Sequence, residues 1–330
     1  MKARRLGELC TLNYGKALRT YDPNTQDSHI VRVFGTNGPI GWTTSPLCEH
    51  PAIIIGRKGA YRGVHYASGP SWTIDTAYYL TLRDSNVDLK WLYYRLLLVD
   101  INRMDTGSAI PSTKREDFYS VSILLPSITA QQHVASLLSA YDDLIENNRQ
   151  RIRLLEQAAR LLYKEWFVRL RFPGHEHVRI KDGVPEGWEK MKLSELADIT
   201  MGQSPQSVYY NEDGSGLPFH QGVTNFGERF PSHQTYCTIQ GRLAEPGDIL
   251  FSVRAPVGRI NITTDKIVIG RGLAAIKSRL GQQNFLFYSL KSHFFKEDMI
   301  GGGAIFAAIT KKDLFGVRLL QPSKLIVEML

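Results

Sequence analysis

The most regular hydrophobic pattern in the chain is a seven-residue repeat between Thr129 and Phe167. Apolar side chains recur there on two lines offset by three residues, as the a and d positions of a heptad do. The first line comprises Leu138, Ile145, Ile152, Ala159 and Trp166, and the second comprises Val134, Tyr141, Asn148, Leu155 and Leu162. The pattern predicts a long helix that packs against another helix through this seam. A long amphipathic helix lying on a globular core is the alternative interpretation.

Sequence signals mark both ends of this helix. Thr129 and Gln132 have the spacing of a capping box, and Phe172-Pro173-Gly174 cannot continue a helix. At 1.5 Å per residue the helix would span about 55 to 60 Å. Asn148 is the one strongly polar seam residue, and a buried polar residue at such a position fixes the register of paired helices. We assign residues 127–170 to this coiled-coil spacer.

The segments on either side of the helix follow one pattern twice. Leu6–Leu9 followed by Gly15 matches Leu193–Leu196 followed by Gly202, in each case 187 positions later. Further matches keep the same order while the offset grows to 196, and they pair Tyr94 with Tyr288, Gly107–Ile110 with Gly302–Ile305, Asp117 with Asp313, and Pro126-Ser127 with Pro322-Ser323. The ordered series predicts a duplicated domain, with an insertion of about nine residues in the second copy.

Within each copy, short β patterns bounded by Gly, Pro or Asp alternate with one helical pattern. The strands expected in the first copy are Ile53–Ile55, Tyr78–Leu82 and Val121–Leu125, with counterparts at Ile249–Val253, Ile267–Ile269 and Val317–Leu320. Helices are expected near Leu89–Asn102 and Phe285–Phe295. The fold class predicted is α+β, with two mixed domains separated by the long helix.

These patterns set the expected domain boundaries. The first domain covers residues 1–126 and the second covers 190–323, with a linker at 171–189 that contains Pro173-Gly174 and Pro185–Trp188 as helix breakers. Residues 324–330 occupy the place where the repeat predicts a second long helix. We therefore interpret the chain as lacking the distal helix.

Composition narrows the class of protein. The chain has 40 Lys and Arg against 32 Asp and Glu, a net charge of +8, which favours a polyanionic partner. Three widely spaced cysteines argue against a disulfide framework or a structural zinc site and suit a reducing cytoplasm. The sequence shows neither a signal-peptide pattern nor an apolar run of membrane-spanning length. The expected location is cytoplasmic.

Motifs of catalysis are missing from the sequence. It contains no G-x-x-x-x-G-K-[ST] loop for ATP, no nucleophile elbow and no Asn-Pro-Pro-Tyr tetrapeptide of an adenine methyltransferase. His175-Glu176-His177 is interpreted as exposed loop rather than as a metal site. We expect this chain to carry no catalytic residue, no metal and no cofactor.

Basic and aromatic residues stand at matching places in the two copies. Such side chains neutralise phosphates, and Arg also reads guanine edges. The DNA-binding candidates are Arg57, Lys58, Tyr61, Arg62, Lys114 and Arg115 in the first copy, and Arg254, Arg259, Lys311 and Lys312 in the second. The alternative is a set of solvated charged loops.

The long helix and the linker resemble the DNA-specificity subunit of type I restriction-modification enzymes. The resemblance rests on Leu125-Pro126, Gln131-Gln132, Leu137–Ser139, Asp142, Ile145–Asn148, Leu155-Glu156, Lys164–Phe167, Phe172–His175, Pro185–Glu189 and Pro246–Leu250. It implies that residues 1–126 and 190–323 are target recognition domains that read a bipartite double-stranded DNA site. It also implies that methyltransferase subunits dock on the helices and bind S-adenosylmethionine, and that an ATP- and Mg-dependent restriction subunit joins them.

The chain departs from that family in the expected absence of the distal helix. We therefore predict that the seam packs against another chain, which would be a second copy, a separately encoded fragment or a methyltransferase subunit. Two alternatives remain at the sequence level, namely a coiled-coil scaffold that binds protein and not DNA, and a non-functional truncated remnant. An enzyme in its own right would need a catalytic constellation that the sequence does not supply.

Overall fold

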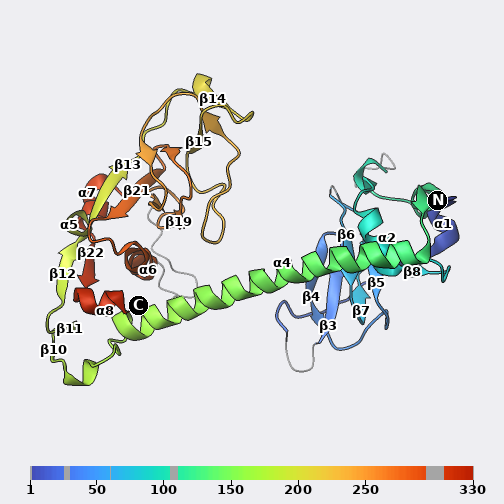
Figure 1. Ribbon diagram of the computed structural model, residues 1–330, viewed down its shortest axis with the longest axis horizontal. Coiled ribbons are helices and arrows are strands. Elements are labelled where there is room, and N and C mark those ends of the chain that lie inside the picture. The colour runs from blue at the N-terminus through green and yellow to red at the C-terminus, as the bar shows by residue number, and fades with distance from the viewer. Residues whose placement is uncertain (1, 26–29, 60, 105–110, 295–307, 330) are drawn as a thin grey trace. The chain divides into compact units, whose positions relative to one another are not determined.

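The computed structural model describes residues 2–25, 30–59, 61–104, 111–294 and 308–329. It divides into two compact units, Met1–Gln150 and Arg151–Leu330. The long helix α4 (Ile128–Tyr163) contributes its first part to one unit and its last part to the other (Figure 1). The repeat match between Gly107–Ile110 and Gly302–Ile305 lies outside the described residues.

The first unit is built on an antiparallel sheet of order β2-β8-β5-β6. Its strands are β2 (Cys10–Tyr14), β8 (Ala77–Leu82), β5 (Ala52–Gly56) and β6 (Val64–Ala67). The central strand β5 is buried on both faces, because Ile53 and Ile55 enter one hydrophobic cluster and Ile54 enters another. An unbroken apolar run is what a strand covered on both faces requires.

Smaller elements complete this unit. They are the pair β1 (Lys2–Arg5) with β9 (Ser122–Leu125), the sheet of β4 (Gly38–Thr43), β3 (Val31–Gly35) and β7 (Ser71–Thr73), and the helices α1 (Leu6–Leu9), α2 (Leu89–Leu96), η1 (Ile101–Arg103) and α3 (Arg115–Ser120). The main cluster of buried side chains joins the sheet to α1, α2 and α3.

The second unit repeats the same plan, which confirms the internal duplication. Its sheet has the order β13-β21-β18-β19, and β12 pairs with β22 as β1 pairs with β9. The equivalent elements are β12 (Glu189–Lys192), α5 (Leu193–Leu196), β13 (Ala197–Met201), β18 (Ile249–Ser252), β19 (Ile260–Ile262), β21 (Leu273–Ser278), α6 (Gln283–Phe294), α7 (Lys311–Gly316), β22 (Arg318–Gln321) and α8 (Lys324–Glu328). A second sheet contains β14 (Tyr210–Asn211), β16 (Tyr236–Cys237), β15 (Leu217–His220), β20 (Ile267–Ile269) and β17 (Leu243–Ala244), next to the turn η4 (Ser207–Tyr209).

One strand equivalence expected from the sequence is wrong. Ile267–Ile269 does form a strand, β20, but its parallel pairing with β15 makes it the counterpart of β7, which pairs in parallel with β3. The counterpart of β8 is β21, because Leu80 pairs with Ile53 as Ile276 pairs with Ile249. The sequence of β21 begins Leu-Ala-Ala, and these small residues give a weak strand signal although the position is fully buried.

The start of α4 also differs from the prediction. The helix begins at Ile128, and the hydroxyl of Ser127 accepts the backbone N–H of Ala130 at 3.4 Å, so the cap lies two residues before the expected Thr129. At its other end α4 gives way to a π-helical turn, η2 (Lys164–Val168). The prediction of a long helix from residue 129 to 167 is confirmed, although its last turn is π-helical and not α-helical.

Residues 171–189, expected as a linker, take part in the second unit. They contain the turn η3 (His175–His177) and a hairpin of β10 (Ile180–Lys181) with β11 (Val184–Pro185). Phe172 and Trp188 are buried, and their rings lie 4.7 Å apart next to that of Phe167. These aromatic contacts attach the end of the long helix to the core of the second unit.

Gln131 is the buried polar residue by which α4 docks on the first unit. Its side chain is fully buried, and its Oε1 accepts the backbone N–H of Asp88 at 2.9 Å. Its Nε2 donates to the carbonyl oxygens of Asn86 and Pro126, each at 3.0 Å. All three partners are backbone groups, so this one side chain joins the start of α4 to the residue after β9 and to the segment before α2.

A buried histidine, His220, contacts the partly buried His233 in the second unit. His220 Nε2 is 2.8 Å from His233 Nδ1, and His233 Nε2 is 3.1 Å from a carboxylate oxygen of Asp265. Burial, with a smaller contribution from the nearby His233, lowers the pKa of His220 to about 4. Hydrogen bonds from Thr264 and His233 hold the pKa of Asp265 below its ordinary value.

We predict that Gln131→Ala lowers the free energy of unfolding of the first unit by roughly 2 to 4 kcal/mol, because buried backbone groups lose their hydrogen-bond partners. The matched control is Gln132→Ala, which removes the same atoms at the neighbouring exposed position. Urea denaturation measures both. Equal stabilities for the two variants would contradict the docking role of Gln131.

We predict that the second unit loses stability as the pH falls from about 6.5 towards 4. The folded pKa of His220 is depressed below the ordinary value of 6.5, so the unfolded chain binds the proton first over this interval. At pH 5 the loss is on the order of 2 kcal/mol relative to pH 7.5. His220→Gln should flatten the profile, whereas His177→Gln at an exposed position should not. Denaturation at pH 7.5 and pH 5 measures the unfolding free energy of each variant. The prediction is wrong if wild type and His220→Gln lose the same unfolding free energy between these pH values.

Candidate nucleic-acid interface

In the first unit the structure brings two of the predicted basic stretches together. Lys58 forms an isolated antiparallel bridge with Ser112, and Thr113 N–H donates to the carbonyl oxygen of Arg57 at 2.9 Å. Helix α3 begins two residues later, at Arg115. Arg57 and Lys58 therefore lie beside Lys114 and Arg115, although more than fifty residues separate them in sequence.

The second unit contains the same backbone arrangement 196 residues later. Arg254 forms an isolated antiparallel bridge with Ala308, and Ile309 N–H donates to the carbonyl oxygen of Val253 at 2.8 Å. Helix α7 begins at Lys311, so Arg254 lies beside Lys311 and Lys312. Arg259 closes the same loop, where its N–H donates to the hydroxyl of Ser252 at 2.9 Å.

The sequence pattern pairs Lys114-Arg115 with Lys311-Lys312, and this register shifts that pairing. The bridges at Lys58 and Arg254 set the offset at 196, which makes Arg115 equivalent to Lys311 and Lys114 equivalent to Thr310. The two basic pairs are thus shifted by one residue relative to each other. Thr310 takes the N-cap of α7, where its hydroxyl accepts the N–H of Asp313 at 3.2 Å, while Lys114 makes no side-chain cap in the first unit.

Most of the predicted side chains are accessible, and Arg62 is the exception. Lys58, Tyr61, Lys114, Arg254, Arg259, Lys311 and Lys312 are exposed, and Arg57 and Arg115 are partly buried. Arg62 is only 2% exposed, and its Nη2 donates to the carbonyl oxygens of Ile101 and Asn102 at 3.3 and 2.8 Å. This placement gives Arg62 a structural role between the loop and η1. A surface phosphate cannot reach its guanidinium in this conformation.

Seven of the predicted cations, five exposed and two partly buried, have no carboxylate partner among the described residues. Within the described residues, Arg57, Lys58, Lys114, Arg115, Arg254, Lys311 and Lys312 form no ion pair with a carboxylate. Arg57 instead donates from Nε and Nη2 to the carbonyl oxygen of Asp75. A neutral acceptor orients the guanidinium without cancelling its charge, and such a surface attracts polyanions.

Sequence reasoning missed Tyr14, which ends β2 next to this basic surface. The guanidinium carbons of Arg57 and Arg115 lie 5.3 and 4.1 Å from the centre of its ring. The only signal in the sequence was the neighbouring Gly15, which has an equivalent in Gly202. A Cβ at Gly15 would lie 2.0 Å from the carbonyl oxygen of Ile74, and one at Gly202 would lie 2.1 Å from that of Gly270. The glycines are needed for close backbone approach, and they reveal nothing of the aromatic residue beside them.

The predicted helix seam is largely exposed. Val134, Leu138, Tyr141, Ile145, Ile152, Leu155 and Leu162 each keep between 37% and 67% of their surface accessible, and Asn148 is exposed as well. Trp166 differs, because it lies in η2 and packs against the core of the second unit. Ala159 is also partly buried there. The pairing of this seam with a second helix stays a prediction.

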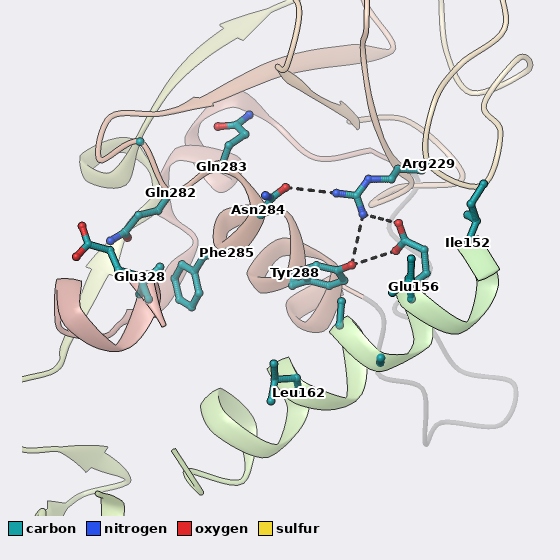
Figure 2. A pocket seen from close by; sticks show the side chains of 15 residues that line it. Ile152, Glu156, Leu162, Arg229, Gln282, Gln283, Asn284, Phe285, Tyr288 and Glu328 are labelled. Atoms are coloured by element: carbon teal, nitrogen blue, oxygen red, sulfur yellow. Dashed lines mark hydrogen bonds and ion pairs between the residues drawn. The ribbon is translucent and has the colours of Figure 1, made fainter. Parts of the chain in front are cut away.

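Equivalent tyrosines attach the two halves of α4 to their units. In the first unit Tyr94 O–H donates to Asp142 at 2.6 Å, and in the second Tyr288 O–H donates to Glu156 at 3.0 Å. Figure 2 shows Tyr288, Glu156 and Arg229 converging, with Arg229 paired to Glu156 and bonded to Asn284. A groove of about 810 Å³ lies beside them, lined by α4, α6 and the end of α8.

Membrane-spanning helices and metal sites are both absent from the described ranges. None of the helices there combines the length and apolar character needed to cross a membrane. Among the same residues, no three His, Cys, Asp or Glu side chains are arranged to hold a metal ion. His175 and His177 are exposed in η3, with Glu176 between them.

Comparison with known proteins identifies one family along most of the chain. The family described as "Type I restriction modification DNA specificity domain" matches residues 1–157 and 185–319. The chain is 39% identical over 207 residues to the "Putative type I restriction enzyme MjaX specificity subunit" of Methanocaldococcus jannaschii, an alignment that covers 61% of this chain and 49% of that protein. It is 28% identical over 227 residues to the type I restriction enzyme MjaIX specificity subunit of the same organism, covering 63% of this chain and 52% of that protein.

The fold is shared with a solved structure. The crystal structure of the type I restriction-modification system S subunit from M. genitalium superposes with a TM-score of 0.66 at 17% identity, and the match covers 99% of this chain and 86% of that one. The chain spans about half the length of the curated relatives it matches. Because the family matches both repeats and most of the intervening helix, the chain belongs to the type I restriction-modification DNA specificity family.

Proposed function

We propose that this chain selects the DNA target of a type I restriction-modification complex, with each unit reading one half of a bipartite double-stranded site. The observation that carries the proposal is the recurrence of one basic loop arrangement in both units. Two copies of one backbone frame on one chain suit a target with two separated recognition elements.

The backbone frame and the side chains have separate roles in this proposal. The bridge between the loop and the start of the following helix recurs at the same offset, so each unit presents its cations from the same scaffold. Exposed Lys and Arg would neutralise backbone phosphates, which fixes orientation without reading sequence. The loops that differ between the units would then contact the base edges.

The chemistry would belong to partner subunits. Methyltransferase subunits would hold S-adenosylmethionine, and a restriction subunit would use ATP and Mg. The proposal follows from the family to which the chain belongs, which is named for DNA specificity. The specificity chain would place these partners on the DNA.

The exposed seam of α4 would be the docking surface for one of these partners. Each large apolar side chain left in water forfeits roughly 1.5 to 3 kcal/mol, so a helix from another chain gains substantially by covering it. A second copy, a separately encoded fragment and a methyltransferase subunit all remain consistent with a heptad seam. Asn148 would set the register of the pairing.

We predict that DNA binding by the chain weakens steeply with salt, by about a hundredfold between 50 and 200 mM if four phosphates are contacted. Lys58→Gln combined with Arg254→Gln should lower the salt slope by about two, because one phosphate contact is lost in each unit. Titration of a labelled duplex measures this slope.

The matched control for that experiment is Lys181→Gln combined with Lys190→Gln, which removes two exposed positive charges away from both loops. Its slope should equal that of wild type. If both double variants changed the slope equally, only net charge would matter and the loops would have no special role. A salt-independent association would instead favour the protein-binding scaffold.

We predict that Leu155→Asp weakens association through the seam about tenfold to a hundredfold, since it places a charge in an apolar contact. Leu154→Asp is the matched control, because Leu154 is similarly exposed but lies off the two seam lines. The mass of the chain in solution, alone and with its methyltransferase subunit, measures both variants. Equal loss in the two variants would remove the seam as the contact surface.

A further inference from the structure

Three side chains of the first unit form a compact cluster that has no equivalent in the second. Both arginines approach the ring of Tyr14. The guanidinium carbon of Arg57 lies 5.3 Å from the ring centre, and that of Arg115 lies 4.1 Å from it. Tyr14 is the last residue of β2, Arg57 directly follows β5, and Arg115 is the first residue of α3. The fold, and not the local sequence, brings them together.

The cluster is held from beneath by a buried tyrosine. The ring of Tyr78 lies 5.1 Å from that of Tyr14, and Tyr78 O–H donates to the carbonyl oxygen of Thr113 at 3.2 Å. Arg57 is fixed on its side by its two hydrogen bonds to the carbonyl oxygen of Asp75. These contacts limit the freedom of Tyr14 and Arg57 before any ligand arrives, which reduces the entropy lost on binding.

The two positive charges of the cluster favour binding of an anion. Arg57 and Arg115 have no carboxylate partner among the described residues. Arg115 Nε is buried and makes no hydrogen bond. Two guanidinium groups on one aromatic ring repel each other, and an anion bound to both would relieve that repulsion. Guanidinium matches phosphate oxygens in geometry as well as in charge.

The exposed ring adds a second kind of contact. Tyr14 is 51% exposed, so one part of the ring packs on Tyr78 and the rest faces solvent. An acidic peptide would use the arginines and leave the ring unused. A nucleic-acid backbone presents a phosphate and, next to it, the apolar face of a sugar, which suits both the cations and the ring.

The equivalent positions of the second unit have different chemistry. Met201 stands where the first unit has Tyr14, Val253 stands in place of Arg57, and Lys311 in place of Arg115. These three positions of the second unit therefore carry one cation and no aromatic ring. The backbone frame is the same in both units, so the difference is confined to the side chains.

We infer that Tyr14, Arg57 and Arg115 form a phosphate clamp that anchors the first unit alone on double-stranded DNA. The two arginines bind a backbone phosphate, and the Tyr14 ring packs against the adjoining deoxyribose. The inference rests on the proposed function and deepens it, because it gives the two units unequal shares of the backbone contact. The clamp fixes the position of the first unit on the duplex while leaving base reading to other loops.

The test is the salt dependence of binding of the full chain to a mixed-sequence duplex of about 30 base pairs. Arg57→Gln combined with Arg115→Gln should lower the salt slope by about one and the affinity about tenfold or more. Tyr14→Ala should lower the affinity about fivefold without changing the slope, whereas Tyr14→Phe should bind as wild type does. Met201→Ala, the equivalent change in the second unit, should leave the affinity within about twofold, because no clamp exists there.

A folding control separates binding from stability. Arg57→Lys keeps the charge and should keep the salt slope while losing affinity, because Lys cannot make the paired contacts of a guanidinium. Thermal denaturation establishes that each variant is folded. An unchanged slope and affinity in the folded double arginine variant would overturn the clamp alone. A loss of methyltransferase association in place of DNA binding would overturn it in favour of a protein contact, and failure of the wild-type chain to bind any duplex would overturn the proposed function and the clamp together.

Discussion

Docking of one long helix on two separate cores is the constraint on which this protein depends. Helix α4 exposes most of its side chains, so its own burial cannot hold it in place. Buried contacts at its two ends do so instead, through Gln131 in the first unit and the aromatic side chains around Tyr163 and Phe167 in the second. Tyr94 and Tyr288 add the same hydroxyl-to-carboxylate bond in each unit.

This way of attaching the helix explains why the apolar seam residues between its ends can remain exposed. The ends satisfy the structural requirement of each unit, and the seam between them is left for a partner. A surface of this kind is costly in water, and its heptad spacing is that of a helix-packing surface rather than of scattered exposed residues. The seam is therefore an uncovered helix-packing surface within the described part of the chain.

The two units share a backbone frame but differ in the side chains placed on it. In both units an isolated bridge ties the loop after the central strand to the residues before the closing helix. On that common frame the first unit places Tyr14 and Arg57, and the second places Met201 and Val253. A frame made of backbone hydrogen bonds tolerates such changes, because the bonds do not depend on side-chain identity. Two recognition surfaces can thus diverge without altering the fold.

The family comparison shows the specificity family. Sequence patterns had anticipated the buried strands β5 and β18, the helices α2 and α6 and the order of the repeats. They had not anticipated the strand β21, whose alanines carry little β signal, nor the participation of Phe172 and Trp188 in the second core.

By itself the sequence determined the long helix, the duplication and the positions of most exposed cations, because heptad spacing, repeated order and charge are properties of the chain read locally. Only the tertiary structure decided which of those cations are available and which neighbours they have. Arg62 is buried, and the carbonyl oxygens of Ile101 and Asn102 accept its hydrogen bonds. Tyr14 contacts Arg57 and Arg115 because the fold brings three segments distant in sequence together. Burial and side-chain contact depend on pairing between distant segments, and no local pattern in the sequence contains that information.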